Sequence, residues 1–282
     1  MTGHVITGTT ELVEGHRIAV YRRGAGRPVL FLHGIPTSAA LWRHIQPNLI
    51  NAADTIAVDL LGYGESDKPE TVAPTLPTQV RLLATLIERW DLRDVLVVGH
   101  DIGGGIAQLL ALRAQRRVTG LVLIDSIAYD SFPEPTIARL KDPGWDERIL
   151  NVDLAAGLRR SLVKGLRDGA EVAAADIAAL YALPFAGPEG RRAYLRAARA
   201  LRTEDLADHM AAVEALAIPA WLVWGSADPF QPLDYGKRLA GALRRSSLTV
   251  IEGGSHFLPE DHPQELTDLL RRAITEARLA QP

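Results

Sequence analysis

Short apolar segments alternate along this chain with longer segments in which apolar residues recur every three or four positions. The short runs are typical of buried strands, and we expect strands at residues 29–32, 55–59, 94–99, 120–124, 220–224 and 247–251. The longer segments predict amphipathic helices, at residues 78–90, 106–114 and 265–279. Such alternation predicts an α/β fold whose mostly parallel central sheet is flanked by helices. Residues 12–17 and 17–21 are expected to form the two strands of an antiparallel hairpin, joined near Gly15, at one edge of the sheet.

The alternation stops between residues 127 and 216. This stretch is rich in Ala, Arg and Leu, and it contains Pro and Gly residues that interrupt regular structure but no convincing buried strand. We therefore predict one core domain made of residues 1–126 and 217–282, with a helical cap at residues 127–216 inserted between two of its strands.

An aspartate occupies the turn that follows the strand expected at 94–99. The segment Gly99-His-Asp101-Ile-Gly103 has the strand–turn–helix context of a G-x-S-x-G nucleophile motif, with a helix expected to begin near Ile106. A carboxylate that attacks an ester gives a reactive anhydride, whereas attack on a saturated or epoxide carbon gives an ordinary ester that water can cleave. The motif favours Asp101 as a nucleophile for such carbons. A helix N-cap is the alternative role.

Further polar segments follow other expected strands, and the carboxyl ends of parallel strands meet at one edge of a sheet. The loop at 31–36 follows the first buried strand, so its Ile35 N–H and the N–H of Ile102 are candidate oxyanion donors. A plain turn with a structural His33 is the alternative. Among the eight histidines, His100 adjoins Asp101 and is expected to point to the other face.

Asp228 and His256 come after the last two expected strands. Asp228 is suited to orient a histidine and His256 to activate water, and the order Asp101, Asp228, His256 matches nucleophile, acid and base in this architecture. An Asx turn before Pro229 is the alternative for Asp228. Asp125, at the end of the strand at 120–124, is the rival acid.

Taken together, these segments resemble the α/β-hydrolase fold, and within it the branch with an aspartate nucleophile: epoxide hydrolases and haloalkane or haloacetate dehalogenases. The resemblance covers nearly the whole chain and rests on HGIPTSAALWRHIQPNL, DLLGYGESDKP, GHDIGG, GSADPF and GGSHF. It implies that Asp101 is the nucleophile, Asp228 the acid and His256 the base. It also implies that Ile35 and Ile102 supply the oxyanion hole.

The chain departs from this branch at the groups that hold the leaving group. Haloalkane dehalogenases usually have tryptophan after the nucleophile and often asparagine in the first loop, whereas this chain has Ile102 and Ile35, which have no side-chain donor. The arginine that follows the aspartate of haloacetate dehalogenases is also absent. Epoxide hydrolases use cap tyrosines, for which Tyr181 and Tyr194 are candidates, and Trp145 could supply one donor. Each of these three residues could instead be part of the packing of the cap.

Composition narrows the functions that remain. The formal charge of −3 indicates no nucleic-acid or anionic-membrane partner, and the absence of cysteine excludes disulfides and thiolate chemistry. We find no metal motif, signal peptide or membrane span, and we expect a cytoplasmic protein without cofactor or metal, acting on a small, apolar molecule with an electrophilic sp³ carbon.

The sequence therefore predicts a cofactor-independent hydrolase that forms and hydrolyses an alkyl-enzyme ester. Epoxide opening is favoured over haloalkane or haloacid dehalogenation, which is the second candidate reaction. The same fold would also suit a non-hydrolytic biosynthetic enzyme or a ligand-binding protein.

Overall fold

One eight-stranded sheet organises the molecule, in the order β1-β2-β4-β3-β5-β6-β7-β8. The computed structural model describes residues 8–167 and 171–279. Strands β3 to β8 pair in parallel, and β2 joins them antiparallel through β4, with β1 as its hairpin partner. The predicted mostly parallel sheet with an edge hairpin is confirmed. The strands are β1 Thr9–Val13, β2 His16–Gly24, β3 Pro28–Leu32, β4 Asp54–Val58, β5 Val95–His100, β6 Val118–Ile124, β7 Ala220–Gly225 and β8 Ser246–Ile251.

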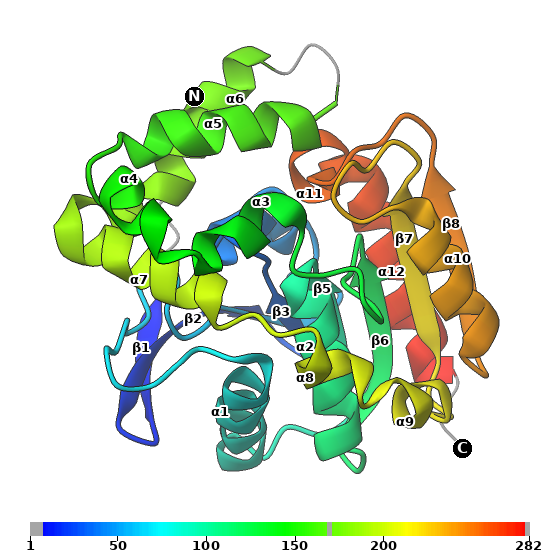
Figure 1. Cartoon of the computed structure of the whole chain (residues 1–282). Helices are drawn as coiled ribbons and strands as arrows, with labels where there is room; N and C mark the ends of the chain where they lie inside the picture. The colour runs from blue at the N-terminus through cyan, green and yellow to red at the C-terminus, as the bar shows by residue number, and fades with distance from the viewer. Residues whose placement is uncertain (1–7, 168–170, 280–282) are drawn as a thin grey trace.

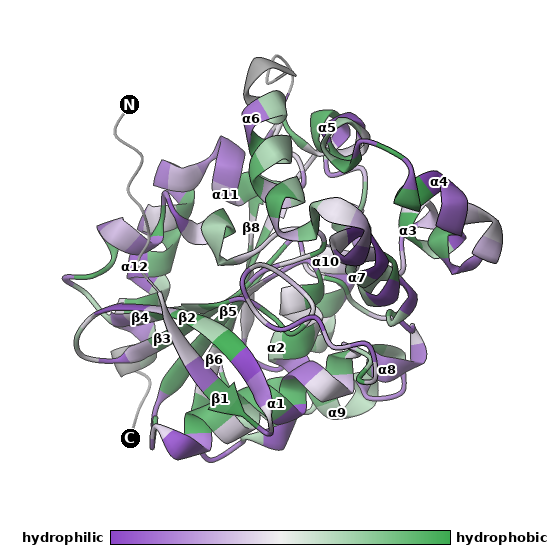
Figure 2. Ribbon diagram, turned by 90° about the vertical axis from the view of Figure 1, so that its left-hand side faces the viewer, coloured by the Kyte–Doolittle hydropathy of each residue, from purple (hydrophilic) through white to green (hydrophobic). Residues whose placement is uncertain are grey.

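The apolar core lies around the middle of the sheet. Every residue of β3, β4 and β5 is buried, which explains why these strands read as continuous apolar runs in the sequence. The central strands and α2 (Ile102–Arg113) are largely green in Figure 2, while α7 (Gly187–Arg199) is mostly purple. The helices of the core are α1 Leu76–Arg89, α2 Ile102–Arg113, α10 Leu233–Ala242, α11 Leu258–Asp261 and α12 Pro263–Leu279.

Helix α2 begins at Ile102, directly after Asp101, and not near Ile106 as the sequence suggested. Three consecutive glycines made the segment look like a turn. They belong to the helix because it passes very close to its neighbours: a Cβ at Gly103 would lie 2.3 Å from the carbonyl oxygen of Leu32. The glycines therefore serve a close approach of helix and sheet rather than a loop.

The described residues between β6 and β7 form helices joined by turns and loops. Helices α4 to α7 lie together at one end of the molecule, whereas α8 and α9 lie beside α1 and α2 (Figure 1). The range 127–216 thus contains a covering part and a return segment that packs on the core. No helix of the described residues is long and apolar enough to cross a membrane. The helices of this segment are α3 Pro135–Ala138, α4 Asp146–Leu150, α5 Leu154–Gly165, α6 Glu171–Ala182, α7 Gly187–Arg199, α8 Glu204–Ala207 and α9 Met210–Glu214.

Candidate active site

The turn between β5 and α2 presents Asp101 in a strained conformation. Its φ of 52° and ψ of −121° lie in a region that residues other than glycine rarely adopt, at a cost on the order of 1–3 kcal/mol. Its side chain does not cap α2, although the residue stands at the N-cap position. Gly34 allows the neighbouring loop to approach, since a Cβ there would lie 2.6 Å from Asp101 Oδ2. The carboxylate is therefore directed across the turn rather than into its own helix.

A backbone donor holds one oxygen of this carboxylate. The Ile35 N–H donates to Asp101 Oδ2 at 3.0 Å, and the Ile102 N–H lies close enough to the carboxylate to lower its pKa. Burial raises the pKa of Asp101 to about 6, although the two N–H groups and the nearby His256 act in the opposite direction. The two donors proposed from the sequence thus already converge on the resting side chain.

The loop that carries Ile35 is fixed by His33. The Leu60 N–H donates to His33 Nε2 at 3.0 Å, so the ring's proton is on Nδ1, which donates to the Gly34 carbonyl at 2.8 Å. Burial lowers the pKa of His33 to about 4, so the ring is neutral. Both ring nitrogens are occupied by backbone contacts, as expected of a structural histidine.

Asp228 and His256 meet after the ends of β7 and β8. His256 Nδ1 donates to Asp228 Oδ2 at 2.8 Å, and the N–H groups of Phe230 and Gln231 donate to Asp228 Oδ1 at 2.7 and 3.0 Å. Burial lowers the pKa of His256, but the carboxylates of Asp228 and Asp101 outweigh this effect, and the net pKa is raised. The pair leaves Nε2 of the imidazole free.

Asp125 lies behind this pair and does not contact the imidazole. The Gly225 N–H donates to Asp125 Oδ1 at 2.8 Å. Burial, together with the nearby Asp228 carboxylate, raises the pKa of Asp125 well above its ordinary value. Asp228 is therefore the acid in contact with the imidazole.

His100 does not turn away from the site, contrary to the expectation from strand alternation. Its Nε2 donates to the carbonyl oxygen of His256 at 2.9 Å, and the two ring centroids are 4.7 Å apart. Burial lowers the pKa of His100 well below its ordinary value, so it is neutral. No local pattern in the sequence indicates this contact, because it joins residues that are 156 positions apart.

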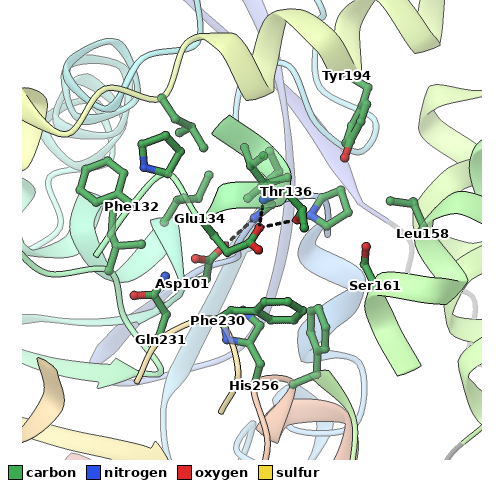
Figure 3. A pocket seen from close by; sticks show the side chains of 18 residues that line it. Asp101, Phe132, Glu134, Thr136, Leu158, Ser161, Tyr194, Phe230, Gln231 and His256 are labelled. Carbon is green, nitrogen blue, oxygen red and sulfur yellow. Dashed lines mark hydrogen bonds between the residues drawn. The ribbon is translucent and has the colours of Figure 1, made fainter. Parts of the chain in front are cut away.

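A pocket lies over Asp101 and His256, between the core and the cap. Most of its wall is apolar, and Figure 3 shows the hydroxyls of Tyr194 and Ser161 pointing into it from α7 and α5. The Tyr194 hydroxyl makes no hydrogen bond with the described residues, and burial raises its pKa to about 12. The polar residues of the lining are Asp101, Glu134, Thr136, Ser161, Tyr194, Gln231 and His256.

Two of the three cap residues proposed as substrate contacts lie elsewhere. The Tyr181 hydroxyl donates to Glu260, which also binds Arg43 at 2.6 and 2.7 Å, so Tyr181 joins the cap to the core. Trp145 lines a neighbouring cavity rather than the pocket over Asp101. Tyr194 alone of the three residues reaches that pocket. The described residues that line it include no tryptophan or asparagine.

Glu134 is a pocket residue that the sequence did not single out. It comes before the short helix α3, and the Thr136 N–H donates to its Oε2 at 2.9 Å. An acidic side chain followed two residues later by threonine is an ordinary helix-start pattern, which carries no sign of a cavity.

Comparisons with known proteins agree with this architecture. The family model described as the alpha/beta hydrolase fold matches residues 27–263. A haloalkane dehalogenase of Mesorhizobium japonicum is 32% identical over 270 residues, which cover 89% of this chain and 84% of the relative. A soluble epoxide hydrolase of a Corynebacterium species is 30% identical over 290 residues, covering 93% and 95%. The crystal structure of a haloalkane dehalogenase of Bradyrhizobium elkani superposes with a TM-score of 0.84 at 28% identity, covering 98% and 99%.

Proposed function

Since the chain belongs to the α/β-hydrolase fold family and is a hydrolase, we propose that Asp101 is its nucleophile, attacking an epoxide carbon. His256, oriented by Asp228, then activates the water that hydrolyses the resulting ester. One observation carries the proposal: the carboxylate of Asp101 lines the pocket with Oδ2 held by the Ile35 N–H and His256 nearby.

In the first step the anchored carboxylate attacks. Oδ2 is held by the Ile35 N–H, so Oδ1 attacks the substrate carbon in line with the breaking C–O bond of the epoxide. The ring oxygen leaves with the bonding electrons and takes the proton of the Tyr194 hydroxyl, which has no other partner among the described residues. The products of this step are an alkyl ester of Asp101 and a tyrosinate.

In the second step water attacks the carboxyl carbon of that ester. His256 takes a proton from the water through Nε2, and Asp228 stabilises the imidazolium. Negative charge develops on Oδ2, which accepts from the Ile35 N–H, and the Ile102 N–H lies beside the same carboxyl group. When the ester C–O bond breaks, the departing alcohol oxygen takes the proton of the imidazolium, and Asp101 is left as a carboxylic acid that carries the second proton of the attacking water. That proton passes through water in the pocket to the Tyr194 tyrosinate, which restores both residues, and the net reaction is epoxide plus water to vicinal diol.

The charge of Asp101 couples the two steps. The ionised carboxylate contributes to the raised pKa of His256 in the resting enzyme. Esterification removes that charge, so the pKa of His256 falls and the neutral, basic form becomes easier to populate. The neutral imidazole is therefore more abundant when the second step needs it.

The lining of the pocket supports an epoxide as substrate. A halide leaving group needs N–H donors, and the side chains of Ile35 and Ile102 provide none, while the described lining includes no indole. The Tyr194 hydroxyl supplies the acidic donor that a ring oxygen needs. A carbon–halogen bond is the second candidate, because the Gln231 amide and the same hydroxyl lie in the pocket and two named relatives are haloalkane dehalogenases.

A single turnover in ¹⁸O-water tests the proposal. With excess enzyme over an aryl epoxide, we expect one label in the peptide that contains Asp101, because water attacks the carboxyl carbon of that residue. His256→Gln should accumulate the unhydrolysed ester, and Asp101→Asn should form none. Label that enters only the diol, with Asp101 unlabelled, would exclude this mechanism.

A further inference from the structure

A second cavity adjoins the pocket on the outer side of the cap. The two cavities share the wall residues Thr136, Ile137, Leu158, Ser161 and Tyr194. The two neighbouring cavities are together called the passage, and the apolar part of the wall they share is made by Ile137 and Leu158. The outer cavity is also where Trp145 lies.

Cationic side chains surround this outer cavity. They are exposed, and none makes an ion pair with a carboxylate of the described residues. Two of the four arginines of α7 do make such pairs: Arg192 with Glu189, and Arg199 with Asp146. The cations are Arg139, Arg148, Arg160 and Lys164.

Two of these guanidinium groups are held together by one indole. Arg139 and Arg148 lie 4.5 and 5.1 Å from the ring centroid of Trp145. Because stacking on the indole already orders the two guanidinium groups in the free protein, less side-chain entropy is lost when they bind an anion.

The inner pocket has the opposite charge. The N–H and hydroxyl of Thr136 both donate to Glu134 Oε2, while Oε1 accepts from none of the described residues. Glu134 is close enough to His256 to contribute to its raised pKa. With Asp101, the inner pocket therefore contains two carboxylates, which repel an anionic group close to the reacting carbon.

We propose that this passage binds an amphiphilic substrate with a terminal oxyanion. The oxyanion lies in the outer cavity among the four cations, the apolar chain passes Leu158 and Ile137, and the electrophilic carbon reaches Asp101. Glu134 excludes the reverse orientation and rejects short acids, in which the anion adjoins the reacting carbon. This substrate class rests on the proposed function of Asp101, whereas the anion site does not.

Binding of unreactive ligands tests the anion site without any chemistry. Calorimetry should compare octanoate, octyl phosphate and octanol, which share one alkyl chain. We expect both anions to bind at least about 5-fold more tightly than octanol at low salt, a preference that is smaller in 0.5 M NaCl because the cations are exposed. The anion that binds more tightly shows whether the site prefers a carboxylate or a phosphate head group.

Residues on one helix provide a matched control. Arg160→Gln with Lys164→Gln should weaken octanoate about 10-fold and leave octanol unchanged. Arg159→Gln, on the same helix but outside both cavities, should change neither ligand. Equal binding of the anions and octanol, or the same loss in the control variant, overturns the proposal.

Turnover tests the orientation. Wild type should open a long ω-epoxy carboxylate with a lower KM than its methyl ester, and it should reject glycidate, the short epoxy acid. Glu134→Gln should raise the ratio of kcat/KM for glycidate to kcat/KM for the methyl ester about 10-fold. Glu147→Gln, which replaces an exposed cap residue, should leave this ratio as in wild type. If Glu134→Gln does not turn over glycidate faster, relative to the methyl ester, than wild type does, the Glu134 carboxylate is not what rejects short acids. If no epoxide reacts at all while octanoate still binds through Arg160, the proposed function fails and the anion site stands.

Discussion

Replacing Asp101 by asparagine should make the protein more stable at neutral pH. Burial raises the pKa of this carboxyl from 3.8 to about 6 in the folded state. At pH 7 the carboxylate is ionised in both states, and the shift of roughly two units corresponds to a cost of about 3 kcal/mol at 1.36 kcal/mol per unit. Asparagine keeps an acceptor for the Ile35 N–H and removes the buried charge, so it should recover most of that free energy.

The dependence on pH identifies the cause of this gain. A raised folded-state pKa means that the folded protein binds the proton more tightly, so wild type loses stability relative to Asp101→Asn as pH rises from about 4 to about 6. The difference should be constant above that range and vanish below it.

Chemical denaturation from pH 4.5 to 8 measures this difference, and at pH 7 the gain corresponds to roughly 5–10 °C in Tm. The exposed Asp208→Asn should show no such trend. A gain that is the same at every pH, or a loss at pH 7, would refute an origin in the buried charge.

Other predictions concern activity. Formation of the alkyl ester should fall as pH decreases through about 6, since only ionised Asp101 attacks, and rapid-quench measurements from pH 5 to 8 can follow it. Asp228→Asn should slow ester hydrolysis about 10⁴-fold. Asp125→Asn should stay within about 5-fold, because Asp125 does not contact the imidazole and asparagine keeps an acceptor for the Gly225 N–H; single-turnover rates separate the two. Gly34→Ala should reduce kcat at least about 100-fold. The Cβ of the alanine would push the Asp101 carboxylate away from the position from which it attacks the substrate carbon. Tyr194→Phe should slow epoxide opening about 100-fold with Tm nearly unchanged, and a normal rate would exclude the hydroxyl as the acid.

The architecture was predictable because its signals are local. Strands covered on both faces need apolar residues at nearly every position, as in β5, and such runs stand out in the sequence. The residues that meet at the site follow the ends of β5, β7 and β8, and the carboxyl ends of parallel strands share one edge. The order of Asp101, Asp228 and His256 therefore sufficed to anticipate that they lie together.

What the sequence left open depends on packing between distant segments. Tyr181 looked like a pocket residue, but its partner Glu260 is 79 positions away and draws the hydroxyl toward the core. The start of α2 was misplaced because a glycine run has the same local pattern in a turn and in a close helix contact. Glu134 resembled an ordinary helix start, and only the position of α3 beside the pocket gives its carboxylate a place in the site.

The buried carboxylate links stability to the proposed chemistry. An oxyanion hole that meets a serine nucleophile is empty at rest, whereas here the Ile35 N–H already bonds Asp101 Oδ2. Such a hole accelerates the second step only if it binds the tetrahedral oxyanion more strongly than the resting carboxylate. The raised pKa of Asp101 indicates that these donors only partly offset burial, so the resting charge is under-stabilised and the carboxylate is more basic and more nucleophilic. In the proposed first step the carboxylate becomes a neutral ester, which relieves its own burial cost, while the negative charge moves to the hydroxyl oxygen of Tyr194.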